Sequence, residues 1–390
     1  MNTLINHALV LNLHQPSGNL EYLLENKQWE AKEILWAMDR MPRSLWGYED
    51  IARVHLSLSG TLLETLINPD FQEKVYGITK VGDLLWFLQN TNLFHILGTG
   101  YYHPVFPLIP ENDWKEQCTR WLGIGKHVFW RSFSGFWPPE MGFCMEMIPL
   151  LKNLGYRYVL VDSKHIEPLE KMSWEEIHYR PHFAKFGNDE IIVIVRDREL
   201  SDAQEAGMDW GWFSYEVNQR TKFCNFVPLV TTCTDGENGG WFRNTNDKSN
   251  FWQYFYREFM NKTRSGLCNI KPVFIDNYLD THGAHGYVNV KTGAWNTGWH
   301  HGEGFVQWTG SQEQKNTLDR IKKVSGKFHQ LSDSNNKIVK NDLEEAYWRI
   351  LRSETSCNVF WGEAWVHRCH QDLDLAEDII DSAIHNVSIS

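Results

Sequence analysis

Short apolar runs, rich in β-branched and aliphatic residues, recur along the chain, and each ends in a polar or glycine-rich turn. Runs that are apolar at nearly every position are typical of strands buried on both faces, as in a parallel sheet. The pattern therefore predicts strands at residues 8–13, 54–58, 94–97, 158–161, 191–195, 227–232 and 272–275, with a weaker one at 133–137.

Stretches with helix-like patterning separate these strands. Residues 111–131 follow Pro110, residues 141–154 end before Gly155, and residues 247–264 end before Gly266, which are typical start and stop signals of helices. Strands that alternate with helices form βαβ units. Seven or eight such units in about 300 residues indicate a parallel barrel, and an irregular one is compatible with this count.

The strand pattern stops near residue 310, and residues 311–324, 340–352 and 372–385 are helix-like. We therefore predict an α/β fold with two domains. A catalytic barrel occupies residues 1–310, and a C-terminal helical subdomain at residues 311–390 packs on it.

Charge and composition remove several functional classes. The 390 residues include 38 Lys and Arg against 49 Asp and Glu, a net charge of −11. This balance disfavours nucleic-acid binding and docking on anionic membranes, because both need basic surfaces. No apolar run approaches the length of a transmembrane helix, and the N-terminus lacks the basic segment and cleavage site of a signal peptide.

The seven cysteines are scattered, and none forms a CxxC pair. A disulfide framework and a zinc ribbon are therefore not indicated, and the cytoplasm is the compartment we expect. The aromatic content is unusual, with 19 Trp residues and an aromatic total of 14%. Trp rings suit the apolar faces of sugars and also suit a protein core, and composition leaves both interpretations open.

Two carboxylates follow predicted strands, where a parallel barrel carries its functional side chains. Glu140 ends the segment FWPPE, in which two prolines stiffen the backbone, and Asp235 begins the segment DGENGGW. One ionised and one protonated carboxyl group facing the same bond are the minimal equipment for glycoside hydrolysis. A helix cap, a loop position or an ion pair is the commoner role of either carboxylate taken alone.

Other polar residues after the strands leave alternatives open. His14, His103, Asp197 and Asp235 are ligand types that suit Zn²⁺, as in a metal-dependent carbohydrate deacetylase, although no HExxH motif is present. Arg196 follows another buried strand, where it either forms an ion pair or contacts a sugar hydroxyl. The sequence contains no Walker A motif, and no GxGxxG motif opens a helix after a strand. A nucleotide cofactor is therefore not indicated.

Five motifs, in order along the chain, make it similar to glycoside hydrolase family 57, whose members are retaining enzymes of α-glucans. They are His14-Gln15-Pro16, GTGYYHPVFPL, Trp137-Pro138-Pro139-Glu140, Asp235-Gly236-Glu237 and SETSCNVFWGEAW. The resemblance runs from His14 nearly to the C-terminus. It implies a (β/α)7 barrel followed by a helical bundle that supplies part of the active-site cleft.

The resemblance also implies a retaining double displacement without a metal or cofactor. Glu140 corresponds to the nucleophile and Asp235 to the acid/base, with carboxyl groups about 5–5.5 Å apart. The residues expected to contact the substrate, an α-glucan or malto-oligosaccharide, are His14, His103, Trp137, Arg196, Glu237, Trp241, Asn358 and Trp361. An α-amylase fits best, while a 4-α-glucanotransferase or a branching enzyme would use the same carboxylates.

Two positions depart from the family pattern. Many members carry a Glu just before the second motif, where this chain has FHILGTG, and many carry an Asp in the fifth motif, where it has Asn358 or Val359. Both positions contact substrate in better-known members, so the departures bear on the sugar subsites and on the reaction preference. A non-catalytic glycan-binding relative is the last alternative, and the retained carboxylate pair argues against it.

Overall fold

The computed structural model describes residues 4–389 except 91, 238–239, 245, 247–248, 296, 298–303 and 333–338. The chain forms two compact units, each assembled from separate segments. The first comprises residues 1–98, 124–137 and 145–291, and the second comprises residues 99–123, 138–144 and 292–390.

The first unit contains a parallel barrel sheet. Its seven strands have the order β3-β2-β1-β9-β8-β5-β4, and a parallel bridge between Gly98 and Phe136 joins the two ends. The strands are β1 Ile5–Leu13, β2 Val54–Leu58, β3 Phe94–Leu97, β4 Gly135–Phe136, β5 Tyr158–Asp162, β8 Asp189–Arg196 and β9 Leu229–Asp235. The predicted irregular (β/α)7 barrel is thereby confirmed.

Burial on both faces explains why the apolar runs predicted these strands. Every residue of β2 and β5 is buried, as are eight of the nine residues of β1. In the register of the sheet, Asn12 of β1 lies opposite Ser57 of β2 and Asp235 of β9. The C-terminal ends of these three strands are therefore level, and the polar residues that end them share one edge of the barrel.

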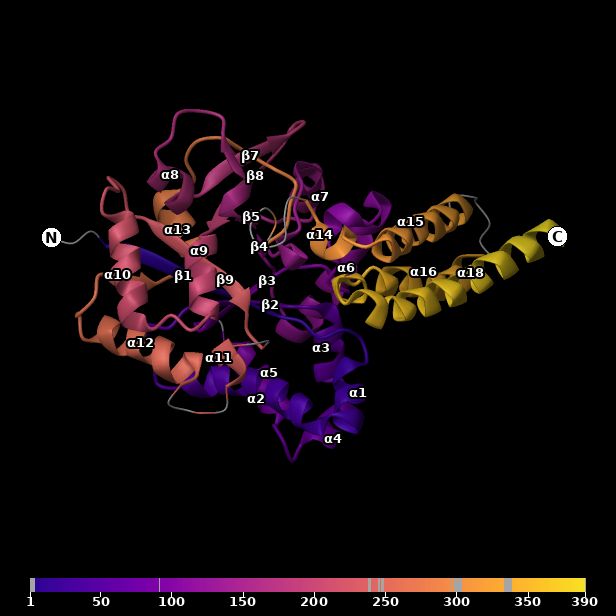
Figure 1. The fold of residues 1–390 in the computed structure, drawn as a ribbon, viewed down its shortest axis with the longest axis horizontal. Helices are drawn as coiled ribbons and strands as arrows, with labels where there is room; N and C mark the ends of the chain where they lie inside the picture. The colour runs from indigo at the N-terminus through magenta and orange to yellow at the C-terminus, as the bar shows by residue number, and fades with distance from the viewer. Residues whose placement is uncertain are drawn as a thin grey trace. The chain divides into compact units, whose positions relative to one another are not determined.

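Helices surround the strands of the first unit (Figure 1). They are α1 Asn19–Asn26, α2 Gln28–Leu45, α3 Gly60–Ile67, α4 Pro69–Val75, α5 Val81–Leu88, α7 Ile148–Asn153, α8 Trp174–Tyr179, α9 Arg198–Glu205, α10 Trp210–Thr221, α11 Gly240–Arg243, α12 Arg257–Arg264 and α13 Ile275–His282. A π-helix, Phe251–Tyr256, precedes α12. Helix α6 Glu111–Phe129 begins in the second unit and ends in the first.

Several short elements differ from the prediction. β10 Ile270–Pro272 pairs with β1 and ends before α13, so the strand predicted at 272–275 is displaced. β7 His182–Phe186 is antiparallel to β8, and β6 Ile166–Pro168 pairs with β11 Val288–Val290 in a separate sheet. The sequence did not indicate β6, β7 and β11, because they are short and β6 and β7 are partly exposed, without a continuous apolar run.

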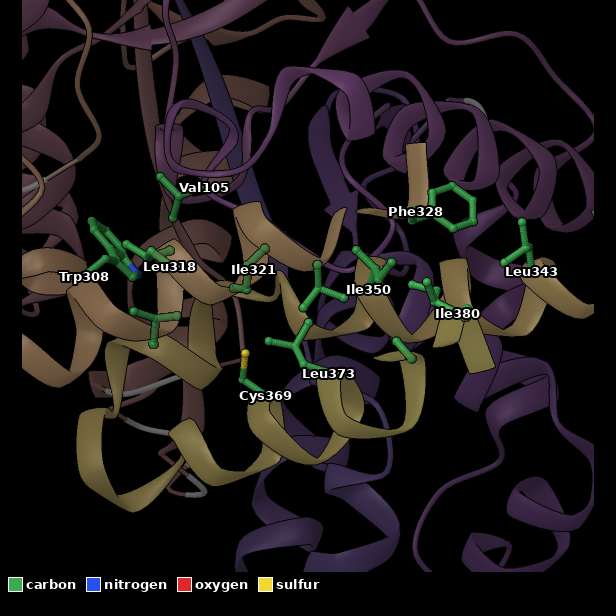
Figure 2. Packing of buried hydrophobic residues seen from close by; sticks show 14 of the residues in the cluster. Val105, Trp308, Leu318, Ile321, Phe328, Leu343, Ile350, Cys369, Leu373 and Ile380 are labelled. Carbon is green, nitrogen blue, oxygen red and sulfur yellow. The ribbon is translucent and has the colours of Figure 1, made fainter. Parts of the chain in front are cut away.

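The second unit is mainly helical. Its helices are α14 Val306–Thr309, α15 Gln312–Ser332, α16 Val339–Ser353, α17 Ser356–Phe360 and α18 Val366–Ile389. Ile321 of α15, Ile350 of α16 and Leu373 of α18 are each fully buried and meet in one apolar core (Figure 2). The predicted domain boundary at 310/311 lies next to the start of α15, and the compact unit also includes earlier segments of the chain.

Candidate active site

Glu140 lies in a tight and strained turn. A 3₁₀ turn spans Pro139–Met141, and two residues separate it from the end of β4. Glu140 has φ 55° and ψ 15°, the left-handed region that non-glycine residues rarely adopt, and Met141 has φ 51°. Such backbone conformations cost about 1–3 kcal/mol each and are concentrated at functional sites. The turn therefore points to a function for Glu140.

Two donors hold the carboxylate of Glu140. Ser356 Oγ donates a hydrogen bond to Oε1 at 2.7 Å, and Trp295 Nε1 donates one to Oε2 at 2.8 Å. The Glu140 side chain is 16% exposed, so part of it is still accessible. Burial raises the pKa of Glu140, and the hydrogen bonds from Ser356 and Trp295 offset part of this effect. The two hydrogen bonds thus fix the orientation of the Glu140 carboxylate.

His103 lies beside the same carboxylate. Its Nδ1 is 3.2 Å from Ser356 Oγ and 3.5 Å from Glu140 Oε1. His103 has φ 57°, so three of the four non-glycine residues with positive φ in the described part of the chain lie here. We call His103, Glu140, Trp295 and Ser356 the Glu140 cluster. All four belong to the second unit.

Asp235 is the last residue of β9 in the first unit, as the sequence predicts for a residue at a strand end. Asn12 Nδ2 donates to Asp235 Oδ1 at 3.0 Å, and the Gly236 amide donates to the Asn12 carbonyl at 2.8 Å. A Cβ at position 236 would lie 2.9 Å from Leu13 Cδ2 and 3.1 Å from Leu11 Cβ, so glycine is needed for this close approach. The main chain after Asp235 is therefore held against β1.

Glu237 and His14 are brought together at the same strand ends. The His14 amide donates to Glu237 Oε1 at 2.8 Å, and both side chains are buried. Burial raises the pKa of Glu237 to about 7, an effect that the His14 hydrogen bond partly opposes. Burial also lowers the pKa of His14 to about 3, so its imidazole is neutral at ordinary pH.

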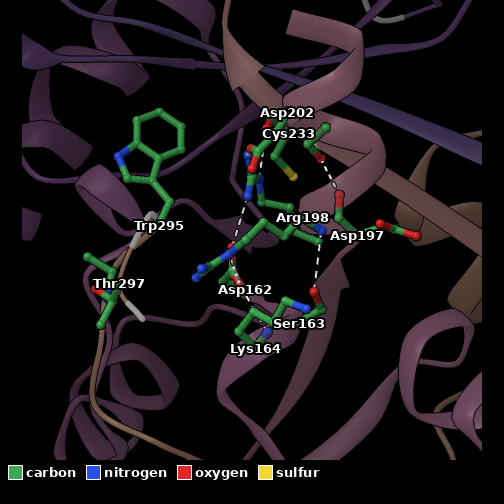
Figure 3. A network of polar contacts seen from close by, with 12 residues as sticks. Asp162, Ser163, Lys164, Asp197, Arg198, Asp202, Cys233, Trp295 and Thr297 are labelled. Atoms are coloured by element: carbon green, nitrogen blue, oxygen red, sulfur yellow. Dashed lines mark hydrogen bonds and ion pairs between the residues drawn. The ribbon is translucent and has the colours of Figure 1, made fainter. Parts of the chain in front are cut away.

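Arg196 lies at the end of β8 in a buried charge network. Figure 3 labels the other members of this network, including Asp162, Arg198 and Asp202. The Arg196 guanidinium donates to Asp162 Oδ2 at 2.9 Å, to Asp202 Oδ1 at 2.7 Å and to the Cys233 carbonyl at 2.9 Å. Arg198 Nε donates to the other oxygen of Asp162 at 2.8 Å. These contacts match the ion-pair alternative for Arg196, and a contact with substrate stays a prediction.

The remaining predicted site residues differ in exposure. Trp137 is fully buried, and Trp241 is 8% exposed with its Nε1 donating to the Gln204 carbonyl at 2.9 Å. Asn358 is buried in α17 of the second unit, whereas Trp361 is 56% exposed there. Among these, the exposed ring of Trp361 is the one that resembles a sugar-binding platform.

The structure thus brings together His103 with Glu140, and His14 with Glu237. The predicted distance between the Glu140 and Asp235 carboxyl groups stays a prediction. Ser356 and Trp295 were not predicted from the sequence. Ser356 lies within the fifth motif, which was the available signal for it, whereas no motif marks Trp295.

No group of three or more His, Cys, Asp or Glu in the described part of the chain is arranged to hold a metal ion. No described helix combines the length and apolar character needed to cross a membrane.

A family model and two related proteins match parts of the sequence. The model of glycosyl hydrolase family 57 matches residues 9–291. An α-amylase of Pyrococcus horikoshii is 25% identical over 199 residues, which cover 50% of this chain and 28% of that protein. A 4-α-glucanotransferase of Thermococcus litoralis is 25% identical over 199 residues, which cover 50% of this chain and 27% of that protein. The match thus spans little more than a quarter of these relatives.

Solved structures share the fold. The 4-α-glucanotransferase of Thermococcus litoralis has a TM-score of 0.68 at 18% identity, covering 98% of this chain and 60% of that chain. A branching enzyme from Pyrococcus horikoshii has a TM-score of 0.71 at 17% identity, covering 98% of this chain and 88% of that chain. Since the family model matches most of the sequence, including the segments that carry Glu140 and Asp235, the chain belongs to glycosyl hydrolase family 57.

Proposed function

We propose that this protein is a retaining enzyme of α-linked glucans, with Glu140 as nucleophile and Asp235 as acid/base. The observation that carries the proposal is the Glu140 cluster. It holds a carboxylate at both oxygens, on a strained backbone, within a motif of a glycoside hydrolase family. Oriented carboxylates of this kind serve as nucleophiles in covalent catalysis.

The proposed reaction has two half-reactions. In the first, a Glu140 oxygen bonds to the anomeric carbon, the glycosidic C–O bond breaks, and Asp235 gives its proton to the departing oxygen. In the second, a water or sugar oxygen bonds to that carbon while the bond to Glu140 breaks. Asp235 takes the proton of the incoming hydroxyl, and two inversions retain the configuration.

The acceptor in the second half-reaction decides the product. Water gives endo-hydrolysis of α-1,4 bonds, as in an α-amylase, and this is the activity we propose. A sugar hydroxyl gives glucanotransfer or branching. Relatives named as α-amylase and as 4-α-glucanotransferase match the chain at the same identity, so both outcomes are measured in the same assay.

The helical subdomain is proposed to contribute to the active-site cleft. Ser356, at the start of α17, donates directly to the proposed nucleophile. Trp361 follows α17 and is exposed, and we propose that its ring stacks on a sugar. Substrate contacts are likewise proposed for His14, Trp137, Arg196, Glu237, Trp241 and Asn358, whereas His103 lies beside the Glu140 carboxylate.

The first experiment incubates the pure protein with maltoheptaose or soluble starch, with and without a chelator, and separates the products by size. We expect shorter products, unchanged by the chelator and absent in Glu140→Gln. Products both shorter and longer than maltoheptaose identify a transferase. Cleavage that is lost with the chelator favours a metal-dependent carbohydrate hydrolase, and oligosaccharide binding without any turnover favours the glycan-binding alternative.

A second experiment separates the two carboxylate roles with azide and an aryl α-glucoside or malto-oligoside. Glu140→Ala should form a β-glycosyl azide, because azide replaces the nucleophile and inverts the configuration once. Asp235→Ala should form an α-glycosyl azide, because azide attacks the covalent intermediate. The opposite pattern contradicts the assignment.

The cytoplasmic location stays a prediction, which fractionation of the source cells tests.

A further inference from the structure

We propose that Ser356 and His103 are positioning residues that act through Glu140, and that they chiefly speed the second half-reaction, in which the Glu140 carboxylate departs from the sugar. The inference rests on the proposed function of Glu140. It gives His103 a role at the nucleophile in place of the substrate contact expected from the sequence, and it gives a role to Ser356.

The geometry forms a short chain of hydrogen bonds. Ser356 Oγ donates to Glu140 Oε1 at 2.7 Å, and His103 Nδ1 lies 3.2 Å from the same hydroxyl. The main chain fixes the two partners to each other, because the Ser356 amide donates to the His103 carbonyl at 3.1 Å. A bridge between Pro104 and Thr355 continues this pairing. The backbone hydrogen bond and the bridge therefore hold Ser356 and His103 in a fixed position relative to each other.

The direction of the protons follows from the groups involved. A nucleophilic Glu140 is ionised and has no proton to donate, so the single hydroxyl proton of Ser356 points to Oε1. Ser356 Oγ then accepts a hydrogen bond from His103, and Nδ1 of His103 is the ring nitrogen that carries the hydrogen. Both hydrogens point toward the carboxylate, so the chain stabilises negative charge on Glu140.

This charge changes during the proposed reaction. Glu140 is a full anion in the free enzyme and an uncharged ester in the covalent intermediate. Only interactions that are stronger in the transition state than in the preceding ground state accelerate a step. Negative charge decreases on Glu140 as it attacks, but it develops again as the ester bond breaks and its electron pair returns to the carboxylate. The donors therefore favour the second half-reaction and give the first no similar gain.

Trp295 holds the other oxygen of the same carboxylate. Its Nε1 donates to Oε2 at 2.8 Å, and its amide donates to the Glu140 carbonyl at 2.9 Å. The Glu140 carboxylate is thus oriented by a donor at Oε2 that Ser356 substitutions leave in place. We therefore expect loss of the Ser356 hydroxyl to destabilise the anion that forms when the Glu140 carboxylate leaves the sugar. The orientation of the carboxylate should change little.

The test follows Ser356→Ala with a nitrophenyl malto-oligoside, whose good leaving group makes the first half-reaction fast. We expect the rate constant for breakdown of the glycosyl-enzyme to fall about 10- to 100-fold, the range for losing a hydrogen bond to a charged group. Because the intermediate accumulates, kcat and KM should fall together and kcat/KM should stay nearly constant. A burst of nitrophenol and an adduct mass on acid-quenched protein should accompany this.

Matched variants separate this role from a merely structural one. Ser356→Thr keeps the hydroxyl and should retain most of the breakdown rate. Ser353→Ala removes a buried hydroxyl that donates to the Ile350 carbonyl and not to Glu140, and should leave the breakdown rate at the wild-type value. His103→Ala should slow breakdown less in the Ser356→Ala background than in the wild type, because its hydrogen bond passes through the serine.

The outcomes distinguish the two proposals. If the wild-type protein forms no glycosyl-enzyme and turns over no α-glucan, the proposed function fails, and with it the basis of this inference. If the wild type is active and Ser356→Ala, with an unchanged Tm, loses kcat/KM without accumulating intermediate, the inference alone is overturned. If Ser356→Ala has a lowered Tm, the Thr variant decides: loss of breakdown despite a restored Tm contradicts the role of the hydroxyl.

Discussion

At the scale of single residues, the ionisation of Glu140 depends on its hydrogen-bond donors. Burial raises the pKa of this carboxyl group, while Ser356 and Trp295 lower it. The nucleophile must be ionised, so the acid side of the pH profile of kcat/KM reports its pKa in the free enzyme. The donors therefore extend activity to lower pH.

Trp295→Phe keeps most of the ring and removes the donor to Oε2. We expect the acid limb of the kcat/KM profile to move to higher pH, because the neutral form of Glu140 becomes more favourable. Activity on a malto-oligoside, measured from pH 4 to pH 8, checks this. Trp365→Phe, at a half-buried ring that contacts the ring of Trp361, is the matched control and should leave the limb in place. An unchanged limb in Trp295→Phe would contradict the role of this donor.

Glu237 makes the stability of the protein depend on pH. Its folded-state pKa of about 7 lies above the unfolded value, so its contribution to stability is fully present below the unfolded pKa and is lost as pH rises toward 7. The loss amounts to at most about 3 kcal/mol at 1.36 kcal/mol per pKa unit. Glu237→Gln removes this decline.

Urea unfolding at pH 5 and pH 8 measures the effect. We expect Glu237→Gln to be more stable relative to the wild type at pH 8 than at pH 5. Glu73→Gln, at an exposed carboxylate in α4, is the control for loss of one negative charge. The prediction is wrong if the difference between Glu237→Gln and wild type is the same at both pH values.

At the scale of elements, the buried network at Asp162 ties strand ends together. Asp162 ends β5, Arg196 ends β8, and Arg198 begins α9. Burial alone would raise the pKa of Asp162, but the two guanidinium groups hold it below its usual value. The carboxylate is therefore charged, and it compensates two buried cations.

Asp162→Ala leaves both guanidinium groups without this partner. We expect the free energy of unfolding to fall by about 3–5 kcal/mol, the range for breaking a buried ion pair from one side. Lys74→Ala removes an exposed ion pair with Glu25 and should cost less than about 1 kcal/mol. Urea denaturation monitored by fluorescence compares the two variants. A loss below 1 kcal/mol in Asp162→Ala would contradict this account.

Strands and helices differed in how well the sequence predicted them. Strands β2 and β3 match their predicted bounds, because apolar residues occupy the first, third and last positions of each. The helix predicted at 141–154 is instead a 3₁₀ turn, Met145–Met147, followed by the short α7. Helical spacing of apolar residues does not distinguish these two forms, since both place side chains on one face at similar intervals.

At the scale of the whole molecule, the Glu140 cluster depends on contacts between distant parts of the sequence. Ser356 is 216 residues from Glu140, and Trp295 is 155 residues from it. A motif predicts a carboxylate from its neighbours in sequence, whereas donors such as these are supplied by the tertiary fold. This is why the sequence marked Glu140 and Asp235 as candidates but did not mark Ser356 and Trp295 as donors to Glu140.

The helical core that carries Ser356 should therefore control activity as well as stability. Leu373 of α18 is fully buried in this core beside α15 and α16 (Figure 2). Leu373→Ala should destabilise the second unit by about 2–5 kcal/mol, the usual cost of such a core truncation. Because Ser356 and Trp295 belong to this unit, loss of its packing should remove the donors from Glu140.

The measurement follows activity and helical circular dichroism of the full chain during urea unfolding. We expect Leu373→Ala to lower the urea midpoint of activity by as much as that of the helical transition, while activity without urea stays near the wild-type value. Leu375→Ala, at a 45% exposed position of the same helix, should move neither midpoint appreciably. Activity that persists after the helical signal is lost would mean that the nucleophile works without its partners in the helical unit.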